Sequence, residues 1–205
     1  MYFKSLTAVA AAAFLVGTAG AQAPAPAPAR PAPTVVSVVP PALTPETTWH
    51  LDLSTGGRVT IQLRPDAAPN HVERIRTLTR QGFYNGIAFH RVIQGFMAQA
   101  GDPGGTGAGG STLPDIAAEF NTLPHVRGSV GMARTNDPNS ANSQFYIMFA
   151  PGFALDNDYT VVGRVVGGMS FVDSITRGDP PANPTRILRA SIGADNVPPP
   201  TASPQ

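Results

Sequence analysis

The sequence predicts a mainly β domain in which a closed sheet is capped at its ends by two α-helices. Many short segments alternate apolar and polar residues, as a strand does when one of its faces is buried. Only two segments have apolar residues at the three-to-four-residue spacing of an amphipathic helix. Turn residues separate these segments at short intervals, which indicates many short strands. We expect the domain to span residues 46–195.

The domain is expected to begin with a β-hairpin. Thr48 to Leu53 and Arg58 to Leu63 both alternate apolar and polar residues, and Thr55-Gly56-Gly57 lies between them. Glycine adopts positive φ at no steric cost, so we expect the two glycines to form the turn with that conformation.

One amphipathic helix is predicted from Asn70 to Gln81. Pro69 suits the first turn of a helix because its missing amide hydrogen has no partner there in any case. Asn70 and Glu73 have the spacing of a capping box. The apolar residues that recur at helical spacing are Val72, Ile75 and Leu78.

The remaining strands follow from the same alternation. The run that begins at Phe89 alternates up to Ile93, is bent at Gly95 and resumes with Phe96 and Met97. The other predicted strands cover residues 128–133, 144–149, 160–166 and 186–192, and residues 168–176 are predicted as a short second helix.

Residues 101–110 contain six glycines, which raises the question of a phosphate-binding loop. The segment lacks the Gly-Lys-Ser/Thr ending of such a loop, and no strand and helix flank it in the required order. We therefore predict a flexible loop beside a site.

The first 23 residues have the three parts of a cleaved signal peptide. Lys4 precedes an apolar stretch from Leu6 to Val16, and Ala21-Gln22-Ala23 forms a small-residue cleavage site. The apolar stretch is shorter than the ~20 residues of a spanning helix, so an uncleaved anchor is the weaker alternative. We expect cleavage after Ala23, a mature chain without a membrane span, and location in the periplasm, with secretion as the alternative.

Two Pro-rich segments flank the predicted domain. Residues 24–45 begin with an Ala-Pro alternation that lacks amide donors and favours polyproline II. Residues 196–205 form a second Pro-rich tail without periodicity. We expect both segments to be disordered, and the first to act as a spacer.

Composition excludes several classes of protein. The chain has no cysteine, so it has no disulfides, thiol catalysis or thiolate metal sites. Its formal net charge is +1, and loss of the predicted signal peptide removes Lys4, the only lysine. A nucleic-acid-binding protein is expected to have a basic face or stripe. None is visible in this sequence, so we expect no nucleic-acid partner.

Four segments carry the strongest functional signal. The first is FHRVIQGFMAQAGD at residues 89–102, which alone fits an edge strand with a solvated arginine. It is followed by GSVGMAR at 128–134, NSQFYI at 142–147 and LDNDYTVVGRV at 155–165. In order and spacing these segments resemble the cyclophilins, which are peptidyl-prolyl cis-trans isomerases. The resemblance extends from about residue 48 to about residue 192 and suggests a bacterial exported form.

The resemblance implies a closed, eight-stranded antiparallel β-barrel with a helix over each open end. It also implies an enzyme that needs no cofactor and no metal. The barrier to rotation about an X-Pro bond is ~18–20 kcal/mol because amide resonance is lost as the bond twists. A pocket that holds the pyrrolidine ring, excludes water and offers a donor to the twisted amide nitrogen lowers that barrier.

The resemblance assigns roles to ten residues of this chain. Arg91 matches the catalytic arginine, whose fixed charge places a donor at the prolyl nitrogen without proton transfer. Without the resemblance, Phe96 and Met97 fit ordinary barrel core, and the two glutamines fit a solvated strand edge. The catalytic set is Arg91, Phe96 and Gln99, and the substrate-binding set is Met97, Ala133, Arg134, Gln144, Tyr146, Leu155 and Tyr159.

The chain departs from the common family pattern at four positions. Arg134 stands where many members have Asn, which leaves open the preference for residues before proline. Tyr146 replaces a frequent Phe, and Tyr159 a frequent His. Ala154 stands where many members have a Trp or Phe that contributes to binding the drug cyclosporin. We therefore expect weak cyclosporin binding with activity retained.

Other catalytic chemistries lack support. The four histidines show no metal-ligand spacing, and no serine lies in a G-x-S-x-G elbow. The residues concerned are His50, His71, His90 and His125, together with Ser129, Ser140 and Ser143.

The sequence thus predicts a monomeric isomerase that accelerates cis/trans exchange at exposed X-Pro bonds of unfolded or flexible exported proteins and so assists their folding. The alternative is a proline-peptide-binding module or holdase chaperone in which turnover is incidental. A further hypothesis is that the chain's own Ala-Pro segment occupies the pocket. Neither the client proteins nor the preference for the residue before proline follows from the sequence.

Overall fold

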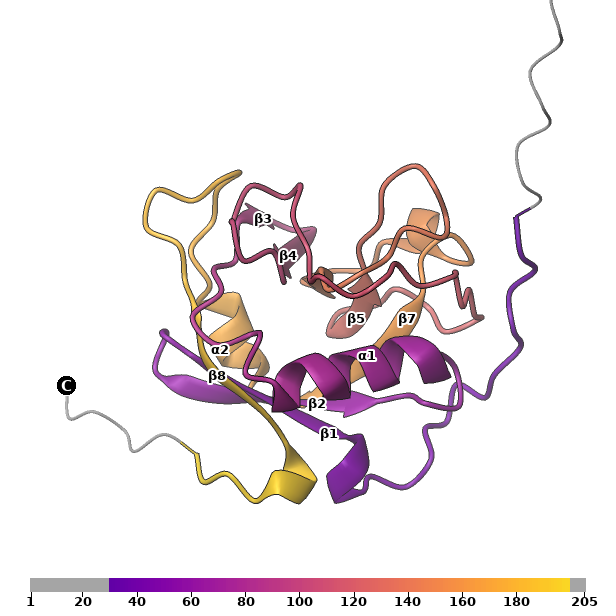
Figure 1. The fold of residues 1–205 in the computed structure, drawn as a ribbon, viewed down its shortest axis with the longest axis horizontal. Helices are drawn as coiled ribbons and strands as arrows, with labels where there is room; N and C mark the ends of the chain where they lie inside the picture. The colour runs from indigo at the N-terminus through magenta and orange to yellow at the C-terminus, as the bar shows by residue number, and fades with distance from the viewer. Residues whose placement is uncertain (1–29, 200–205) are drawn as a thin grey trace, which may run out of the picture.

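The computed structural model describes residues 30–199 (Figure 1). The predicted signal peptide and the first part of the Ala-Pro linker lie outside the described residues. The strands are β1 (Thr48–Leu53), β2 (Gly57–Leu63), β3 (Arg91–Ile93), β4 (Met97–Ala100), β5 (Ser129–Met132), β6 (Phe145–Met148), β7 (Val161–Gly167) and β8 (Ile187–Ile192). The helices are α1 (Pro69–Arg80) and α2 (Met169–Asp173), with short 3-10 turns η1 (Pro45–Thr47), η2 (Phe153–Leu155) and η3 (Gly193–Asp195).

All eight strands form one antiparallel sheet in the order β3-β4-β6-β5-β7-β2-β1-β8. The predicted closure of the barrel is not confirmed: the sheet is a curled half-barrel whose edge strands, β3 and β8, share no ladder. Isolated bridges lie near these edges, between Ala88 and Arg186 and between Val92 and Gly178. Ile187, the first residue of β8, also accepts from the amide of Gly86 at 2.6 Å and donates to Ile87 O at 2.8 Å. β3 has three residues, and its Val92 exchanges backbone hydrogen bonds with Gly178 instead of with a residue of β8.

The predicted hairpin is present, and its two glycines serve different purposes. Gly56 adopts a φ of +96° at the turn, as expected. Gly57 does not have positive φ. A Cβ at Gly57 would overlap the ring of Phe171 in α2, so this glycine allows the helix to approach β2 closely.

The core lies inside the curl of the sheet and is rich in aromatic side chains. Trp49, Tyr84 and Phe145 are fully buried, with ring centroids 4.9 to 5.7 Å apart in tilted or edge-on contacts. Helix α1 packs against β8 and buries Val72, Ile75 and Leu78, as its spacing predicted. The edge-on contacts among Trp49, Tyr84 and Phe145 are favoured because the positive edge of one ring meets the negative face of another.

The N-terminus of α1 is capped from a distant part of the chain. Asn70 and Glu73 form no capping box, and the N-cap residue Ala68 has no side-chain acceptor. Instead, the carboxylate of Glu119 accepts hydrogen bonds from the backbone amides of Asn70 and His71, both at 3.0 Å. A carboxylate at this end of a helix satisfies free N–H groups and opposes the positive end of the helix dipole.

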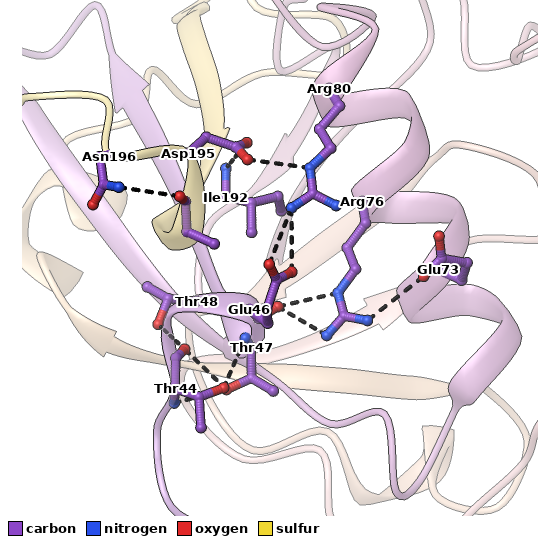
Figure 2. A network of polar contacts seen from close by, with 11 residues as sticks. Thr44, Glu46, Thr47, Thr48, Glu73, Arg76, Arg80, Ile192, Asp195 and Asn196 are labelled. Carbon is purple, nitrogen blue, oxygen red and sulfur yellow. Dashed lines mark hydrogen bonds and ion pairs between the residues drawn. The ribbon is translucent and has the colours of Figure 1, made fainter.

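Polar contacts join both ends of the domain to α1 (Figure 2). Arg80 contacts Glu46 and Asp195, each at 3.2 Å, and thereby links η1 to η3. Arg76 donates to the carbonyl oxygen of Glu46 at 2.8 Å and pairs with Glu73 at 3.5 Å. The first and last elements of the domain are therefore held on the same helix.

The described part of the linker is not a detached spacer. The Thr34 amide donates to Phe120 O at 2.7 Å, and the nearly buried guanidinium of Arg64 donates to Ser37 O at 2.7 Å. At the other end, Arg58 and Arg189 donate to the carbonyl oxygen of Pro198. These contacts join Thr34, Ser37 and Pro198 to residues of the domain. Disorder of the two flanking segments stays a prediction.

Candidate active site

The hairpin of β3 and β4 places Arg91 opposite Gln99. Gly95, with a φ of +71°, forms the turn between the strands, and the ladder pairs Arg91 with Gln99. Neighbouring partners on one face of an antiparallel pair lie within side-chain reach. Nη1 of Arg91 donates to Oε1 of Gln99 at 3.5 Å.

A chain of amide hydrogen bonds continues from Gln99 into the glycine-rich loop. Nε2 of Gln99 donates to Oε1 of Gln144 at 2.8 Å. Nε2 of Gln144 in turn donates to the carbonyl oxygens of Gly107 and Gly109 at 2.9 and 2.7 Å. Each amide therefore has its orientation set by the next group, and the loop is joined to the arginine through two side chains.

The glycine-rich loop was predicted to be flexible beside a site, and it does lie beside the candidate site. The carboxylate of Asp102 accepts from the backbone amides of Gly104, Thr106 and Gly107, all at 2.8 Å. Burial opposes ionisation of Asp102, but these amide hydrogen bonds outweigh it and lower its pKa. The charged carboxylate thus organises the loop from within.

An apolar cluster, separate from the main core, forms the floor of the site. Met97, Tyr146 and Met148 are buried in it. The partly buried residues packed against them are Ile93, Phe96, Ala133, Leu155 and Tyr159. A Cβ at Gly131 would overlap the Tyr146 ring, so the absence of a side chain on β5 makes room for that ring.

Behind the floor, Tyr146 is the first of three hydrogen-bonded side chains. Its hydroxyl lies 2.9 Å from Nε2 of His125, and Nδ1 of His125 lies 2.8 Å from Oδ1 of Asp156. Burial lowers the pKa of His125 against the opposite effect of Asp156, and burial raises the pKa of Tyr146 well above its usual value. A neutral imidazole that donates from Nδ1 and accepts at Nε2 satisfies all three groups.

Arg134 lies at the wall of the site with its donors occupied. Its Nη2 pairs with Oδ1 of Asp158 at 2.9 Å, and its Nη1 donates to Thr135 O at 2.8 Å. Its guanidinium carbon lies 4.5 Å from the centroid of the Tyr159 ring. The guanidinium of Arg134 is therefore held in place beside Tyr159, where it forms part of the wall of the site.

An open cavity of about 850 Å³ lies at this site. The cavity includes nine of the ten residues predicted from the sequence: Arg91, Phe96, Met97, Gln99, Ala133, Arg134, Tyr146, Leu155 and Tyr159. Gln144 lines an adjoining cavity of about 270 Å³ together with Gln99, Ala133 and Arg134. The structure thus brings the whole predicted set together from β3, β4, β6 and η2 and from the residues just before β4, β6 and β7 and just after β5.

Sequence reasoning missed several residues of the cavity. Asp179 and Pro180 line it, and the carboxylate of Asp179 pairs with Nε of Arg91 at 3.2 Å. His90 also lines it, and burial lowers its pKa. Asp179 follows Arg91 by 88 residues and belongs to no motif, so no sequence signal indicates the pairing.

The site offers a fixed cationic donor above an apolar floor. This arrangement can hold an apolar ring and stabilise a developing lone pair beside it, without a nucleophile or proton transfer. Within residues 30–199, no three His, Asp or Glu side chains are grouped as they would be around a metal ion. In the same part of the chain, no helix combines the length and apolar character needed to cross a membrane.

Comparison with known proteins places the whole domain in one family. Residues 50–192 match the family model described as "Cyclophilin type peptidyl-prolyl cis-trans isomerase/CLD". A probable peptidyl-prolyl cis-trans isomerase of Brucella suis is 51% identical over 170 residues, which cover 75% of this chain and 86% of the relative. Peptidyl-prolyl cis-trans isomerase B of Bacillus subtilis is 37% identical over 133 residues, 64% of this chain and 92% of the relative.

Solved structures agree with this assignment. A cyclophilin from Hirschia baltica superposes with a TM-score of 0.70 at 31% identity, covering 76% of this chain and 77% of that one. A cyclophilin type isomerase from Cryptosporidium parvum, solved in the presence of the dipeptide Ala-Pro, gives 0.66 at 25% identity over 71% of this chain and 98% of that one. The chain therefore belongs to the cyclophilin-type peptidyl-prolyl cis-trans isomerases.

Proposed function

We propose that the cavity catalyses cis/trans exchange by holding the proline ring on the apolar floor while Arg91 donates to the prolyl nitrogen. One observation carries this proposal: the guanidinium of Arg91 and the floor around Phe96, Met97 and Tyr146 line the same cavity. As the amide twists, its nitrogen becomes pyramidal and gains a lone pair. A donor held at that point interacts more strongly with the transition state than with either planar isomer.

The glutamines support the arginine and the peptide. Gln99 accepts from Arg91 and donates to Gln144, which is held by two loop carbonyls. Rotation of the side-chain amide of Gln99 or Gln144 would break a hydrogen bond of this network. It keeps the donor in place before the substrate arrives, so that little reorganisation accompanies the reaction.

Ala133 and Arg134 are proposed to face the residues that precede proline. Ala133 follows β5, and its amide donates to Gln144 O at 2.9 Å, which fixes its backbone. Outside the strand ladders, its carbonyl oxygen accepts no hydrogen bond within residues 30–199, and we assign it to a peptide amide. Arg134 is held against Tyr159 and Asp158, which makes it a wall that narrows this end of the site. We expect the wall to limit bulky side chains there.

Weak cyclosporin binding remains part of the proposal. Ala154 lies in η2 beside Leu155, and its side chain is exposed. A single methyl group at this position presents far less apolar surface to a large apolar ligand than an aromatic ring does. Proline itself rests on the floor, so turnover does not depend on Ala154.

We also propose that the enzyme acts on unfolded or flexible proteins in the periplasm. The support is the signal-peptide pattern of residues 1–23, which lies outside the described residues. Uncatalysed X-Pro exchange takes tens of seconds or more and limits folding, and a catalyst of exchange needs no energy source. Cell fractionation that leaves the mature chain in the cytoplasm would contradict this location.

The alternative function, a proline-binding module or holdase, is tested by asking whether suppression of aggregation survives the loss of X-Pro exchange. The test measures X-Pro exchange and suppression of client aggregation for the mature chain and for Arg91→Ala. The isomerase proposal predicts that Arg91→Ala loses X-Pro exchange and, with it, the suppression of client aggregation. Full protection by a variant that has lost exchange would favour the holdase, because binding would then suffice.

A further inference from the structure

Arg91 is held by acceptors on two sides of its guanidinium. Nε donates to Oδ2 of Asp179 at 3.2 Å, and Nη1 donates to Oε1 of Gln99 at 3.5 Å. The guanidinium is a planar fork, so two anchored nitrogens fix its plane. Nη2 makes no hydrogen bond within residues 30–199, and it is the nitrogen left for the substrate.

Of the two acceptors, Asp179 is the stronger. Its carboxylate is charged and lies closer to Arg91 than the neutral amide of Gln99 does, and charge-assisted hydrogen bonds are about twice as strong as neutral ones. Gln99 is also engaged with Gln144, so it cannot follow the arginine freely. The carboxylate therefore contributes most to the orientation of the fork.

Asp179 is itself placed by backbone contacts with β3. Val92 and Gly178 exchange two hydrogen bonds, from Val92 N to Gly178 O at 2.7 Å and from Gly178 N to Val92 O at 2.9 Å. Each partner is one residue away from the ion pair. On the other side, Arg177 donates to Oε1 of Gln94 at 2.8 Å. The segment that carries Asp179 is thus fixed to the strand that carries Arg91.

We propose that Asp179 is a positioning residue for Arg91, which holds the guanidinium so that Nη2 faces the prolyl nitrogen. The inference rests on the proposed role of Arg91 and extends it to a residue outside every motif of the chain. The side chains of Arg91 and Asp179 are 40% and 58% exposed. Solvent screens such a pair, so its effect is on orientation and is modest in size.

The test compares kcat and KM for the mature chain with Asp179→Ala and Asp179→Asn. We expect kcat to fall about two- to five-fold in Asp179→Ala, the range that corresponds to an exposed ion pair, with KM unchanged. Asp179→Asn keeps an acceptor without the charge and should restore part of kcat. In NMR spectra the Arg91 Nε–H signal should broaden in Asp179→Ala, because its proton then exchanges with water.

Asp173→Ala is the matched control. It removes an ion pair with Arg127 at 2.6 Å whose side chains are 42% and 48% exposed and which does not line the cavity. This variant should leave kcat and the Arg91 signal unchanged. An equal loss of kcat in Asp173→Ala, or an unchanged or raised kcat in Asp179→Ala, would overturn the inference.

The same series separates failure of the inference from failure of the proposed function. If Arg91→Ala is inactive and Asp179→Ala is fully active, only the positioning role of Asp179 is wrong. If Arg91→Ala is itself fully active, the proposed role of Arg91 is wrong, and the positioning role of Asp179 is wrong with it.

Discussion

At the residue scale, the hydroxyl of Tyr146 distinguishes this pocket from one with phenylalanine at that position. The ring contributes to the apolar floor, whereas the hydroxyl is engaged with His125 behind it. We therefore expect the ring to affect peptide binding and the hydroxyl to affect stability.

Tyr146→Phe should lower the free energy of unfolding by about 1 to 3 kcal/mol, because Nε2 of His125 is left buried without a partner. The ring remains, so X-Pro exchange should change little. Urea unfolding measures the first quantity and NMR exchange the second. Tyr159→Phe is the control, since the Tyr159 hydroxyl makes no hydrogen bond within residues 30–199. Equal stability of the two variants would show that the contact with His125 contributes nothing.

Stability should also fall on mild acidification. Burial lowers the pKa values of His50, His90 and His125 from the usual value of 6.5. The unfolded chain therefore binds more protons than the folded chain just below pH 6.5, and the free energy of unfolding rises with pH in that range. The stabilisation is complete above the pKa of histidine in the unfolded chain and is lost as the pH falls below that value.

The expected result is a lower urea midpoint at about pH 5 than at about pH 7, a range above the usual pKa values of the carboxyl groups. His125→Gln should show a shallower dependence because one buried titrating group is gone. A midpoint that stays constant or rises on acidification would contradict the burial of neutral histidines.

At the element scale, the cap of α1 shows where local sequence patterns stop being informative. Asn70 and Glu73 have capping-box spacing, yet Glu119, 49 residues after Asn70, takes the amides. Tertiary packing brings this carboxylate to the end of the helix, and no local sequence pattern predicts it. The helix itself was predicted within one residue at each end because Val72, Ile75 and Leu78 mark its buried face.

Glu119→Ala should lower the free energy of unfolding by about 2 to 4 kcal/mol, since it removes a helix cap and leaves the buried His71 without its carboxylate. Glu73→Ala on the same helix is the control. Its side chain is 65% exposed, and its single pair with Arg76 should contribute less than about 1 kcal/mol. Thermal and urea unfolding give the comparison, and similar losses in the two variants would refute the long-range cap.

The site was more predictable from the sequence than the contacts that support it. Motif residues such as Arg91 and Gln144 are recognisable one by one, and the ladder between β3 and β4 explains why Arg91 meets Gln99. Asp179 and His125 are recognisable only after folding. Asp179 reaches Arg91 through a bridge between Val92 and Gly178, and such isolated bridges leave no periodic pattern.

At the scale of the whole molecule, the sheet is open where the sequence suggested closure. Alternating segments predict strands and their buried faces, but they do not determine whether the first and last strands in space are long enough to pair. The gap between β3 and β8 is crossed by the segment of Gly178 and Asp179, so a loop occupies the position that a closed ladder would take. That loop carries the proposed partner of Arg91.

The linker should stabilise the domain without affecting its chemistry. A chain that starts at Thr44 loses the contacts of Thr34 and Ser37, and with them an acceptor of the nearly buried Arg64. We expect a lower unfolding temperature than for the mature chain, with the same kcat. Equal unfolding temperatures would mean that these contacts contribute nothing. Equal peptide affinities of the two chains would exclude occupation of the pocket by the Ala-Pro segment.

The central claim is that Arg91 accelerates X-Pro exchange in this cavity, and NMR exchange in a short Ala-Pro peptide tests it most directly. The mature chain is compared with Arg91→Ala and with Arg127→Ala, which removes a similarly exposed arginine outside the cavity. We predict rapid exchange with the mature chain and with Arg127→Ala, and a loss on the order of 100-fold or more in Arg91→Ala. Undiminished exchange in Arg91→Ala, or peptide binding without exchange in the mature chain, would contradict the account.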